Sequence, residues 1–276
     1  MKSLRQLLYE YTPQIIRDLI GQFNKIIYKG EIYRCPICLS DLRLFYPLPD
    51  YFRINLEING RIYTAYDFET MNVENYMCPV CRGSDRERLY ALYLKMRYED
   101  LKDNKTLVHF APEKSLSKYL KQKIKRNYRT ADLLMKDVDD RLDITNMNIY
   151  ETDSVNCFIC SHVLEHVRDD KKALQELFRI LKPPGWGILM VPLIPELDET
   201  YEDFSKTTEE ERLRHFGQED HVRVYAKKDF IKKMENAGFI IHQIGRDYFG
   251  KDVFNRCGIS EKSFLYIVEK GGLTTS

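Results

Sequence analysis

Apolar and polar positions in the middle of the chain change from a continuous apolar run to helical spacing and back. Two runs of buried-strand length, at 155–160 and 186–191, enclose this helical pattern. Asp169 and Asp170 favour a helix start, and residues 183–185, Pro-Pro-Gly, favour its end. The apolar residues at helical spacing are Ala173, Leu174, Leu177, Phe178 and Leu181. A unit of this kind predicts two parallel strands joined by a right-handed crossover.

The same criteria predict further elements on both sides of this unit. Strands are expected at 106–110, 238–244 and 263–270, and weaker ones at 128–131 and 142–144. The other expected helices span residues 3–28, 86–101, 116–124 and 229–237. Alternation of strands and helices predicts an α/β fold, with a doubly wound, Rossmann-like and mostly parallel sheet.

The first hundred residues have a different pattern. After the leading helices, apolar residues alternate in YFRINLEI (51–58) and RIYTAYDF (61–68), which indicates antiparallel strands. We therefore expect residues 1–100 to hold the leading helices and a zinc-ribbon-like β module. Residues 101–276 would then form the Rossmann-like domain.

Two matching CPxC pairs stand in the N-terminal part, Cys35–Cys38 and Cys78–Cys81. Two such turns bring four thiolates to one tetrahedral centre, which suits a closed, structural zinc site. Iron in a rubredoxin-like site is the alternative metal. A third pair, Cys157 and Cys160, lies inside an apolar strand, where alternate residues point to opposite faces. We expect these two cysteines to pack in the core.

Composition and charge exclude some classes of function but do not identify the function. The 276 residues carry a formal net charge of +1 and 43% hydrophobic residues, so a sizeable core is expected, with no bulk attraction to nucleic acid or anionic lipid. No run of the sequence is long and apolar enough to predict a membrane span. Four cysteines suited to a metal site favour a reducing, cytoplasmic location over disulfides.

In a parallel sheet, ligands bind beyond the carboxyl ends of the strands, which places Ser161, His162, Glu165 and His166 at a binding edge. The pattern H-x-x-E-H at 162–166 is also that of inverted zinc proteases, but that site needs both histidines on an established helix. Here the pattern begins at a strand end. The alternative is that these histidines only satisfy the turn.

These residues also carry a family resemblance. An apolar strand, HVLEHV, the amphipathic helix and LKPPG together resemble the central part of a class I S-adenosylmethionine-dependent methyltransferase. VHFAPEKSL (108–116), ADLL (131–134), LDITN (142–146) and the cysteine pairs resemble a bacterial subgroup of that superfamily. Most members have a glycine-rich loop where this chain has Ala111 and Pro112.

The resemblance implies a cofactor site for S-adenosylmethionine. Glu113 would bind the cofactor's ammonium, Asp132 the ribose hydroxyls, and Asp143 with Ile144 the adenine. The implied cofactor-binding residues are Phe110, Ala111, Glu113, Asp132, Asp143, Ile144, Ser161 and His162.

The polar segment HFGQEDHVRVY (215–225) follows the fifth expected strand, at the edge where this superfamily binds its acceptors. His221 and His162 are the candidate bases, with Asp220 beside them. His215, Arg223 and Tyr225 are further acceptor-site candidates. A small-molecule or sugar-like acceptor fits the near-neutral charge. The alternatives are an RNA methyltransferase that uses the zinc module to bind substrate, and a non-catalytic zinc-binding adaptor.

Overall fold

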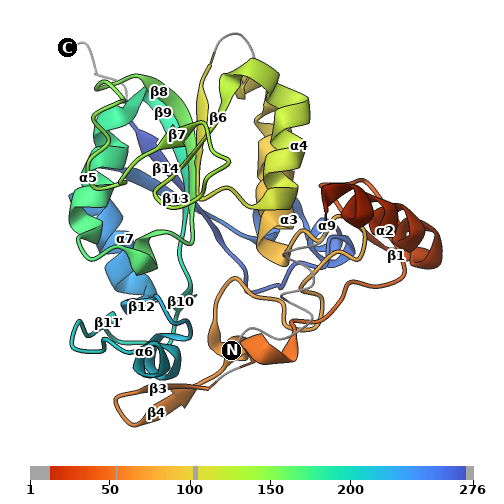
Figure 1. The fold of residues 1–276 in the computed structure, drawn as a ribbon, viewed down its shortest axis with the longest axis horizontal. Coiled ribbons are helices and arrows are strands. Elements are labelled where there is room, and N and C mark those ends of the chain that lie inside the picture. Colours follow the sequence, from red (N-terminus) through yellow and green to blue (C-terminus); the bar gives the residue numbers. More distant parts are fainter. Residues whose placement is uncertain (1–12, 54, 102–104, 272–276) are drawn as a thin grey trace.

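The computed structural model describes residues 13–53, 55–101 and 105–271, and a seven-stranded sheet forms its centre (Figure 1). The strands are β5 (Leu107–Phe110), β6 (Tyr128–Asp132), β7 (Asp140–Arg141), β8 (Val155–Ser161), β9 (Leu181–Met190), β13 (Ile240–Ile244) and β14 (Leu265–Lys270). Their spatial order is β13-β14-β9-β8-β5-β6-β7, and only β14 runs antiparallel to its neighbours. The predicted doubly wound, mostly parallel α/β fold is confirmed.

The strand order reverses between β5 and β8. The chain runs outward from β5 through β6 to β7 and then returns to β8 on the other side of β5. In open α/β sheets, such a switch point opens a crevice at the carboxyl ends of the strands. The order therefore marks the ends of β5 and β8 as the place to seek a ligand site.

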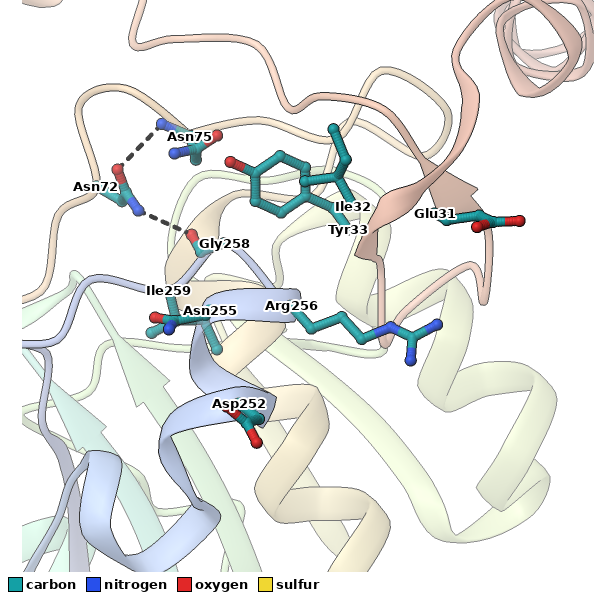
Figure 2. Close-up of a pocket in the computed structure, with 10 residues that line it drawn as sticks. All are labelled: Glu31, Ile32, Tyr33, Asn72, Asn75, Asp252, Asn255, Arg256, Gly258 and Ile259. Atoms are coloured by element: carbon teal, nitrogen blue, oxygen red, sulfur yellow. Dashed lines mark hydrogen bonds between the residues drawn. The ribbon is translucent and has the colours of Figure 1, made fainter.

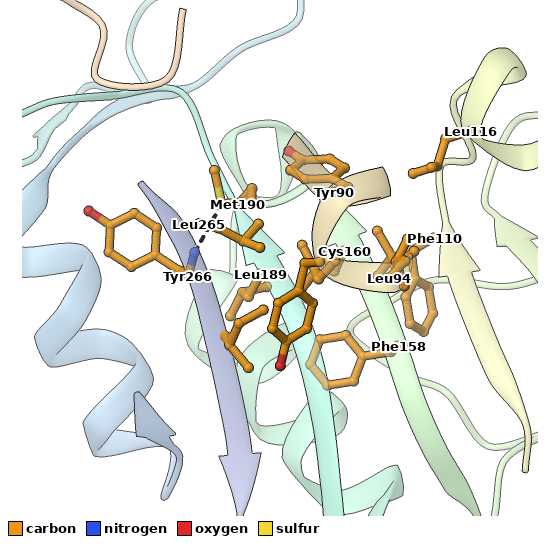
Figure 3. Close-up of a cluster of buried hydrophobic side chains, with 14 of the residues drawn as sticks. Tyr90, Leu94, Phe110, Leu116, Phe158, Cys160, Leu189, Met190, Leu265 and Tyr266 are labelled. Carbon is orange, nitrogen blue, oxygen red and sulfur yellow. Dashed lines mark hydrogen bonds between the residues drawn. The ribbon is translucent and has the colours of Figure 1, made fainter. Parts of the chain in front are cut away.

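Helices cover both faces of the sheet. In Figure 1, α5 (Asp170–Ile180) and α7 (Lys227–Asn236) lie on one side, and α3 (Asp85–Met96) and α4 (Lys114–Ile124) lie on the other. Figure 3 shows Tyr90 and Leu94 of α3 beside Phe110, Phe158 and other strand residues. Burial of these side chains, at about 25 cal/mol per Å² of apolar surface, is the main force that holds α3 on the sheet.

Helix α5 begins where the sequence predicts. Asp169 accepts a hydrogen bond from the N–H of Lys172 at 2.9 Å and so caps the helix. The end differs, because α5 stops at Ile180 and β9 already begins at Leu181, whose backbone pairs with Val155. Residues 183–185 therefore lie in the strand, beyond the helix end.

The third strand lies earlier than predicted. Residues 142–144 were expected as a strand, but β7 is Asp140–Arg141, which pairs with Ala131 and Asp132. After β7 the side chain of Asp143 accepts hydrogen bonds within its own turn, and these compete with further strand pairing.

The N-terminal part is built from short elements around the cysteines. They are α2 (Gln14–Ile27), β1 (Lys29–Arg34), β2 (Asp41–Leu42), η1 (Asp50–Phe52), β3 (Leu56–Ile58), β4 (Arg61–Tyr63), η2 (Ala65–Asp67) and η3 (Tyr98–Leu101). The expected antiparallel strands are present, since β3 and β4 form a hairpin. The turn residues Asn59 and Gly60 both have positive φ, as a two-residue hairpin turn requires. Of the leading helices predicted at 3–28, the part before residue 13 lies outside the described residues.

One hydrophobic core joins the two halves of the chain. Cys35, Leu42 and Phe45 belong to the same buried cluster as Leu107 and Phe158 of the sheet. The predicted boundary near residue 100 stays a prediction, but the buried core is continuous across it.

Smaller elements complete the structure. They are η4 (Lys125–Asn127), η5 (Leu164–His166), β10 (Leu193–Ile194), β11 (Tyr201–Glu202), α6 (Glu209–Phe216), β12 (Arg223–Ala226), α8 (Arg246–Phe249) and α9 (Lys251–Arg256). β10, β12 and β11 form a separate three-stranded sheet. Among the described residues, no helix has the length and apolar character needed to cross a bilayer.

Candidate functional site

The four cysteines of the CPxC pairs form one compact cluster. Cys35 Sγ lies 3.6 Å from Cys81 Sγ, and Cys38 Sγ lies 3.8 Å from Cys78 Sγ. Four thiolates bound to one Zn²⁺ at about 2.3 Å would stand about 3.8 Å apart in a tetrahedron. The sulfur positions are therefore consistent with a closed zinc site of four cysteine ligands, and the four predicted ligands come together as one group.

Both CPxC turns have the same backbone geometry. The carbonyl of Cys35 accepts from the N–H of Leu39, and that of Cys78 accepts from the N–H of Arg82, each at 2.9 Å. Leu39 and Arg82 both have positive φ, 60° and 67°. This repeated tight turn presents the two sulfurs of each pair to a common centre.

The second CPxC turn also contacts the helices that lead to the carboxyl edge. Ser115 Oγ, in the first turn of α4, donates to the carbonyl of Cys81 at 2.5 Å. Ser84 caps α3 in a capping box with Glu87. Glu87 Oε1 accepts from the N–H of Leu116 at 3.1 Å. These bonds tie the cysteine cluster to the amino ends of α3 and α4.

The turn after β5 adopts a conformation that favours glycine. Phe110 is buried at the end of the strand, and Ala111 has a φ of 47°. The N–H of Ala111 donates to the carbonyl of Ala131 on the neighbouring β6 at 2.9 Å. The backbone at this position therefore has the geometry of a glycine turn, although HFAPE contains no glycine.

Glu113 and Arg86 meet at this turn. Glu113 Oε2 lies 2.7 Å from His109 Nε2, and Glu113 Oε1 lies 4.0 Å from Arg86 Nε. Both Glu113 Oε1 and Arg86 Nε are buried, and neither hydrogen-bonds to a residue that the structure describes. A carboxylate and a guanidinium with unused hydrogen-bonding capacity fit the ammonium and carboxylate of an amino-acid group.

The charge on Glu113 is stabilised by its neighbours. Burial alone would raise the pKa of Glu113, but His109 and Arg86 outweigh it and lower the pKa to about 2. Sequence reasoning missed Arg86, which it treated as the start of a connecting helix. The arginine becomes visible as a site residue only once α3 packs beside the end of β5.

The acidic residues predicted to hold the nucleoside lie at the same edge. Asp132 ends β6, and its Oδ1 accepts from the N–H groups of Leu134 and Met135 at 2.7 and 2.6 Å. Asp143 follows β7 and is exposed, and its Oδ1 accepts from the N–H two residues on at 2.8 Å. Ile144 is buried. Each carboxylate thus organises its own turn through one oxygen.

Ser161 and His162 end the adjacent strand, β8. Ser161 is buried, and its Oγ lies 2.9 Å from the hydroxyl of Tyr90 on α3. His162 has a φ of 55°, and its Nδ1 lies 3.3 Å from Glu165 Oε1. Burial lowers the pKa of His162 below its usual value. The imidazole is therefore neutral at pH 7 and able to accept a proton.

A polar cluster lies next to His162. His221 Nε2 is 3.9 Å from Glu165 Oε1, and His166 Nδ1 is 3.2 Å from Asp220 Oδ2. The rings of His166 and His221 meet edge to face, with 4.6 Å between centroids. The structure thus brings the predicted residues His162, Asp220 and His221 together with Glu165 and His166.

The cluster holds ionised carboxylates beside a neutral histidine. Burial alone would raise the pKa of Glu165, but the surrounding imidazoles of His162, His221 and His166 outweigh it and lower the pKa to about 2. His166 also lowers the pKa of Asp220. Burial lowers the pKa of His221 to about 4. At pH 7 a neutral His221 therefore faces an ionised Glu165.

Three further candidates from the 215–225 segment have structural contacts. The buried Arg223 donates to the backbone carbonyls of Leu164, Val167 and Arg168. Tyr225 is also buried and donates to Asp170 at 2.7 Å. The third candidate is His215, whose Nδ1 lies 3.0 Å from the hydroxyl of Tyr201. Arg223 and Tyr225 therefore fix the turn after β8 to β12.

Two cavities lie away from these residues. The larger, of about 470 Å³, lies between β1, the segment around Asn72 and Asn75, and α9 (Figure 2). The second, of about 310 Å³, is lined by Asn156, Trp186 and Lys270, among others. None of the predicted site residues lines either cavity.

Sequence comparison gives a partial family match. Residues 121–244, which are under half of the chain, match a family model described as a methyltransferase domain. No curated protein matches the chain significantly. The family match, on a sheet with this strand order, supports a class I S-adenosylmethionine-dependent methyltransferase domain.

Solved structures with a weak likeness carry the same description. An S-adenosylmethionine-dependent methyltransferase from Archaeoglobus fulgidus is 11% identical, with a TM-score of 0.43, covering 68% of this chain and 96% of that chain. A putative methyltransferase from Bacillus halodurans is 16% identical, with a TM-score of 0.41, covering 65% of this chain and 98% of that chain. The fold described above follows from the strand order itself.

Proposed function

We propose that the protein transfers a methyl group from S-adenosylmethionine to a small-molecule or sugar-like acceptor. The observation that carries the proposal is the buried pair of Glu113 Oε1 and Arg86 Nε, both without hydrogen bonds among the described residues. The pair stands at the switch point of the sheet, and residues 121–244, which form other strands of that sheet, match a methyltransferase domain.

The cofactor residues follow from this position. Arg86 would bind the carboxylate of the cofactor's methionine part, and Glu113 its ammonium. Asp132, one strand over, would accept hydrogen bonds from the ribose hydroxyls. Asp143 and Ile144 would contact the adenine. Once bound, S-adenosylmethionine supplies an electrophilic methyl group.

Phe110, Ala111 and Ser161 complete the proposed cofactor site. Phe110 and Ala111 shape the floor of the turn after β5, and Ala111 holds its strained backbone there. Ser161 connects the end of β8 to α3 through Tyr90. These residues would position the cofactor by shape and backbone geometry.

His162, Asp220 and His221 form the proposed acceptor side. His162 is the better candidate for the base, because its side chain is partly exposed while that of His221 is almost fully buried. Positioning of acceptor and methyl would supply most of the rate. A base would add to it for an acceptor hydroxyl or amine.

We also propose that Cys35, Cys38, Cys78 and Cys81 hold a structural zinc ion, because the sulfur spacing fits Zn²⁺. The HFAPE motif and the CPxC pairs would then mark a subgroup of the superfamily. Four cysteines grouped as ligands of one metal ion fit a reducing, cytoplasmic location better than disulfides would.

Calorimetry tests the cofactor site directly. S-adenosylmethionine or its demethylated product should bind with micromolar affinity, about −7 to −9 kcal/mol. Glu113→Gln should weaken binding by tenfold to a hundredfold, since a charge-assisted hydrogen bond contributes about 1.5–3 kcal/mol. Arg246→Gln, at a half-exposed ion pair with Glu261, is the matched control and should bind as the wild type does.

Three outcomes would contradict the proposal. No binding of either ligand would favour the zinc-binding adaptor. Binding of NAD in their place would indicate a different cofactor class. Equal affinity in the wild type and Glu113→Gln would place the cofactor elsewhere. Unfolding curves of each variant separate loss of binding from loss of fold.

The acceptor needs its own assay. Transfer of a labelled methyl group to fractionated small molecules and to RNA would show which class is modified. His162→Ala should then lower methyl transfer by about 10²–10⁴ at saturating S-adenosylmethionine. Unchanged turnover in that variant would remove His162 from the role of base.

A further inference from the structure

A second group of metal-ligating side chains lies at the carboxyl edge, apart from the cysteines. One ligand atom each from Glu165, His166 and His221 lies within 4.8 Å of the others. Ligand atoms bound to one ion at about 2.1 Å stand about 3.4 Å apart in a tetrahedron. Side-chain movements that shift these atoms by about an ångström would bring the three to that spacing. Two of the three residues, Glu165 and His221, come from segments far apart in sequence.

The group has buried polar atoms that no described residue satisfies. Glu165 is fully buried, and neither of its carboxylate oxygens accepts a hydrogen bond from the part of the chain that the structure describes. The same holds for Nε2 of His221, which is 3% exposed. A buried carboxylate whose oxygens accept no hydrogen bond is costly unless it is paired or binds a metal. Of these atoms, Glu165 Oε1 and His221 Nε2 lie 3.9 Å apart.

The surrounding contacts are those expected around metal ligands. Nδ1 of His221 lies 3.2 Å from the carbonyl of Phe216, which leaves Nε2 available as a ligand. His162 Nδ1 stands beside Glu165 Oε1, and the Asp220 carboxylate stands beside His166. Ligating histidines commonly donate their other ring N–H to a carbonyl or carboxylate, which fixes the ring orientation.

The backbone that carries the group is rigidly joined. The N–H of Val222, the residue after His221, donates to the backbone carbonyl of Glu165 at 2.9 Å. Arg223 donates to the carbonyls of Leu164, Val167 and Arg168, on both sides of Glu165 and His166, and its own charge is paired with Glu202. The two segments therefore hold Glu165 and His166 opposite His221 without a bound ion. His166 is one-third exposed and opens the group to solvent.

We infer that Glu165, His166 and His221 bind a divalent transition-metal ion of the zinc class. Two imidazoles and one carboxylate form a ligand set that leaves at least one coordination position open. Since Glu165 lies next to His162, the ion would lie on the proposed acceptor side. There, the ion would bind an acceptor oxygen and lower the pKa of its hydroxyl. This role in acceptor binding rests on the proposed methyltransferase function, but the metal site does not.

The test counts zinc ions in the full-length protein. After dialysis against buffered micromolar Zn²⁺, elemental analysis should find two equivalents per chain, one for the cysteines and one for the new site. Glu165→Gln and His166→Asn should each retain about one equivalent. His242→Asn is the matched control, because His242 pairs with a single carboxylate on β14, and it should retain two. Zinc X-ray absorption should show nitrogen or oxygen ligands beside sulfur in the wild type and lose them in both variants.

One equivalent in the wild type would overturn the inference. A second equivalent that persists in both variants would also overturn it, because the ion would then be bound elsewhere. His166 is partly exposed, so His166→Asn still tests the metal site if the buried Glu165→Gln variant does not fold. Calorimetry with S-adenosylmethionine on the same samples separates the two ideas. Cofactor binding with one zinc rejects only the metal site, whereas two zincs without cofactor binding reject only the methyltransferase.

Discussion

At the residue scale, two strained backbones mark the ends of neighbouring strands. Ala111 follows β5 and His162 follows β8, and both have positive φ although neither is glycine. Non-glycine residues in this region cost about 1–2 kcal/mol and persist where the surrounding structure determines them. Here the N–H groups of both residues donate to a neighbouring strand, Ala111 to Ala131 and His162 to Met190. The strain lies where the proposed cofactor and acceptor meet.

This strain gives a prediction for position 111. Ala111→Gly should fold at least as stably as the wild type and keep its cofactor affinity, because glycine adopts a φ of 47° freely. Ala111→Val should lose about 1–3 kcal/mol of stability and bind S-adenosylmethionine more weakly, since a β-branched residue is an outlier there. Urea unfolding and calorimetry check both. Equal stability of the two variants would show that this turn relaxes in solution.

Single residues also show how far sequence reasoning reaches. The cysteine spacing predicts a ligand set that comes together in space, because each CPxC turn is a local structure. Arg86 gives no such signal, because only the packing of α3 against β5 brings it to Glu113. Likewise, the motif at 162–166 is readable, but its partner His221 lies on a distant segment. Pairings set by tertiary packing are what the sequence alone does not specify.

At the element scale, α5 holds the segment that follows β7. Arg179 of α5 donates to the carbonyls of Met147 and Tyr150 at 3.0 and 2.9 Å. Glu176 accepts from the N–H of Met147 at 2.7 Å. These bonds fix Met147 and Tyr150 on α5, just after the turn that contains Asp143 and Ile144, the proposed adenine contacts.

Glu176 should make this anchoring dependent on pH. Its ion pair with Arg179 lowers the pKa of Glu176 below the usual value. A carboxyl whose pKa is lower in the folded state stabilises the fold above its unfolded pKa, and this contribution is lost as pH falls through the folded pKa. Glu176→Gln should therefore be less stable than the wild type at pH 7, and the difference should shrink below about pH 4.

Urea unfolding of both proteins between pH 3 and pH 7 measures this difference. Lys171→Gln on the same helix is a control, because Lys171 is exposed and takes no part in the ion pair of Glu176 with Arg179. A difference that stays constant with pH would show that Glu176 acts through packing alone.

At the scale of the whole molecule, the cysteine cluster and the proposed cofactor site form one continuous structure. The second CPxC turn leads directly into Ser84, the cap of α3, and α3 carries Arg86. At Gly83 an added Cβ would lie 2.6 Å from Ile37 Cδ1, so the two CPxC turns approach closely there. The two CPxC turns and α3 are therefore joined to the carboxyl edge by direct contacts.

This continuity predicts that loss of the structural metal weakens cofactor binding. Cys38→Ser removes one of the four sulfurs, and the remaining three should hold zinc poorly. The Cys81 carbonyl would then no longer fix Ser115 at the start of α4, and the cap of α3 would loosen. We expect S-adenosylmethionine affinity to fall at least tenfold and the thermal midpoint to drop, while the central sheet keeps its circular-dichroism signal.

Ser40→Ala is the matched control, because Ser40 Oγ lies 3.4 Å from Cys38 Sγ but is not a ligand. This variant should keep both its zinc and its cofactor affinity. Loss of zinc from Cys38→Ser with wild-type cofactor affinity would show that the contacts through Ser84 and Ser115 do not couple the two sites.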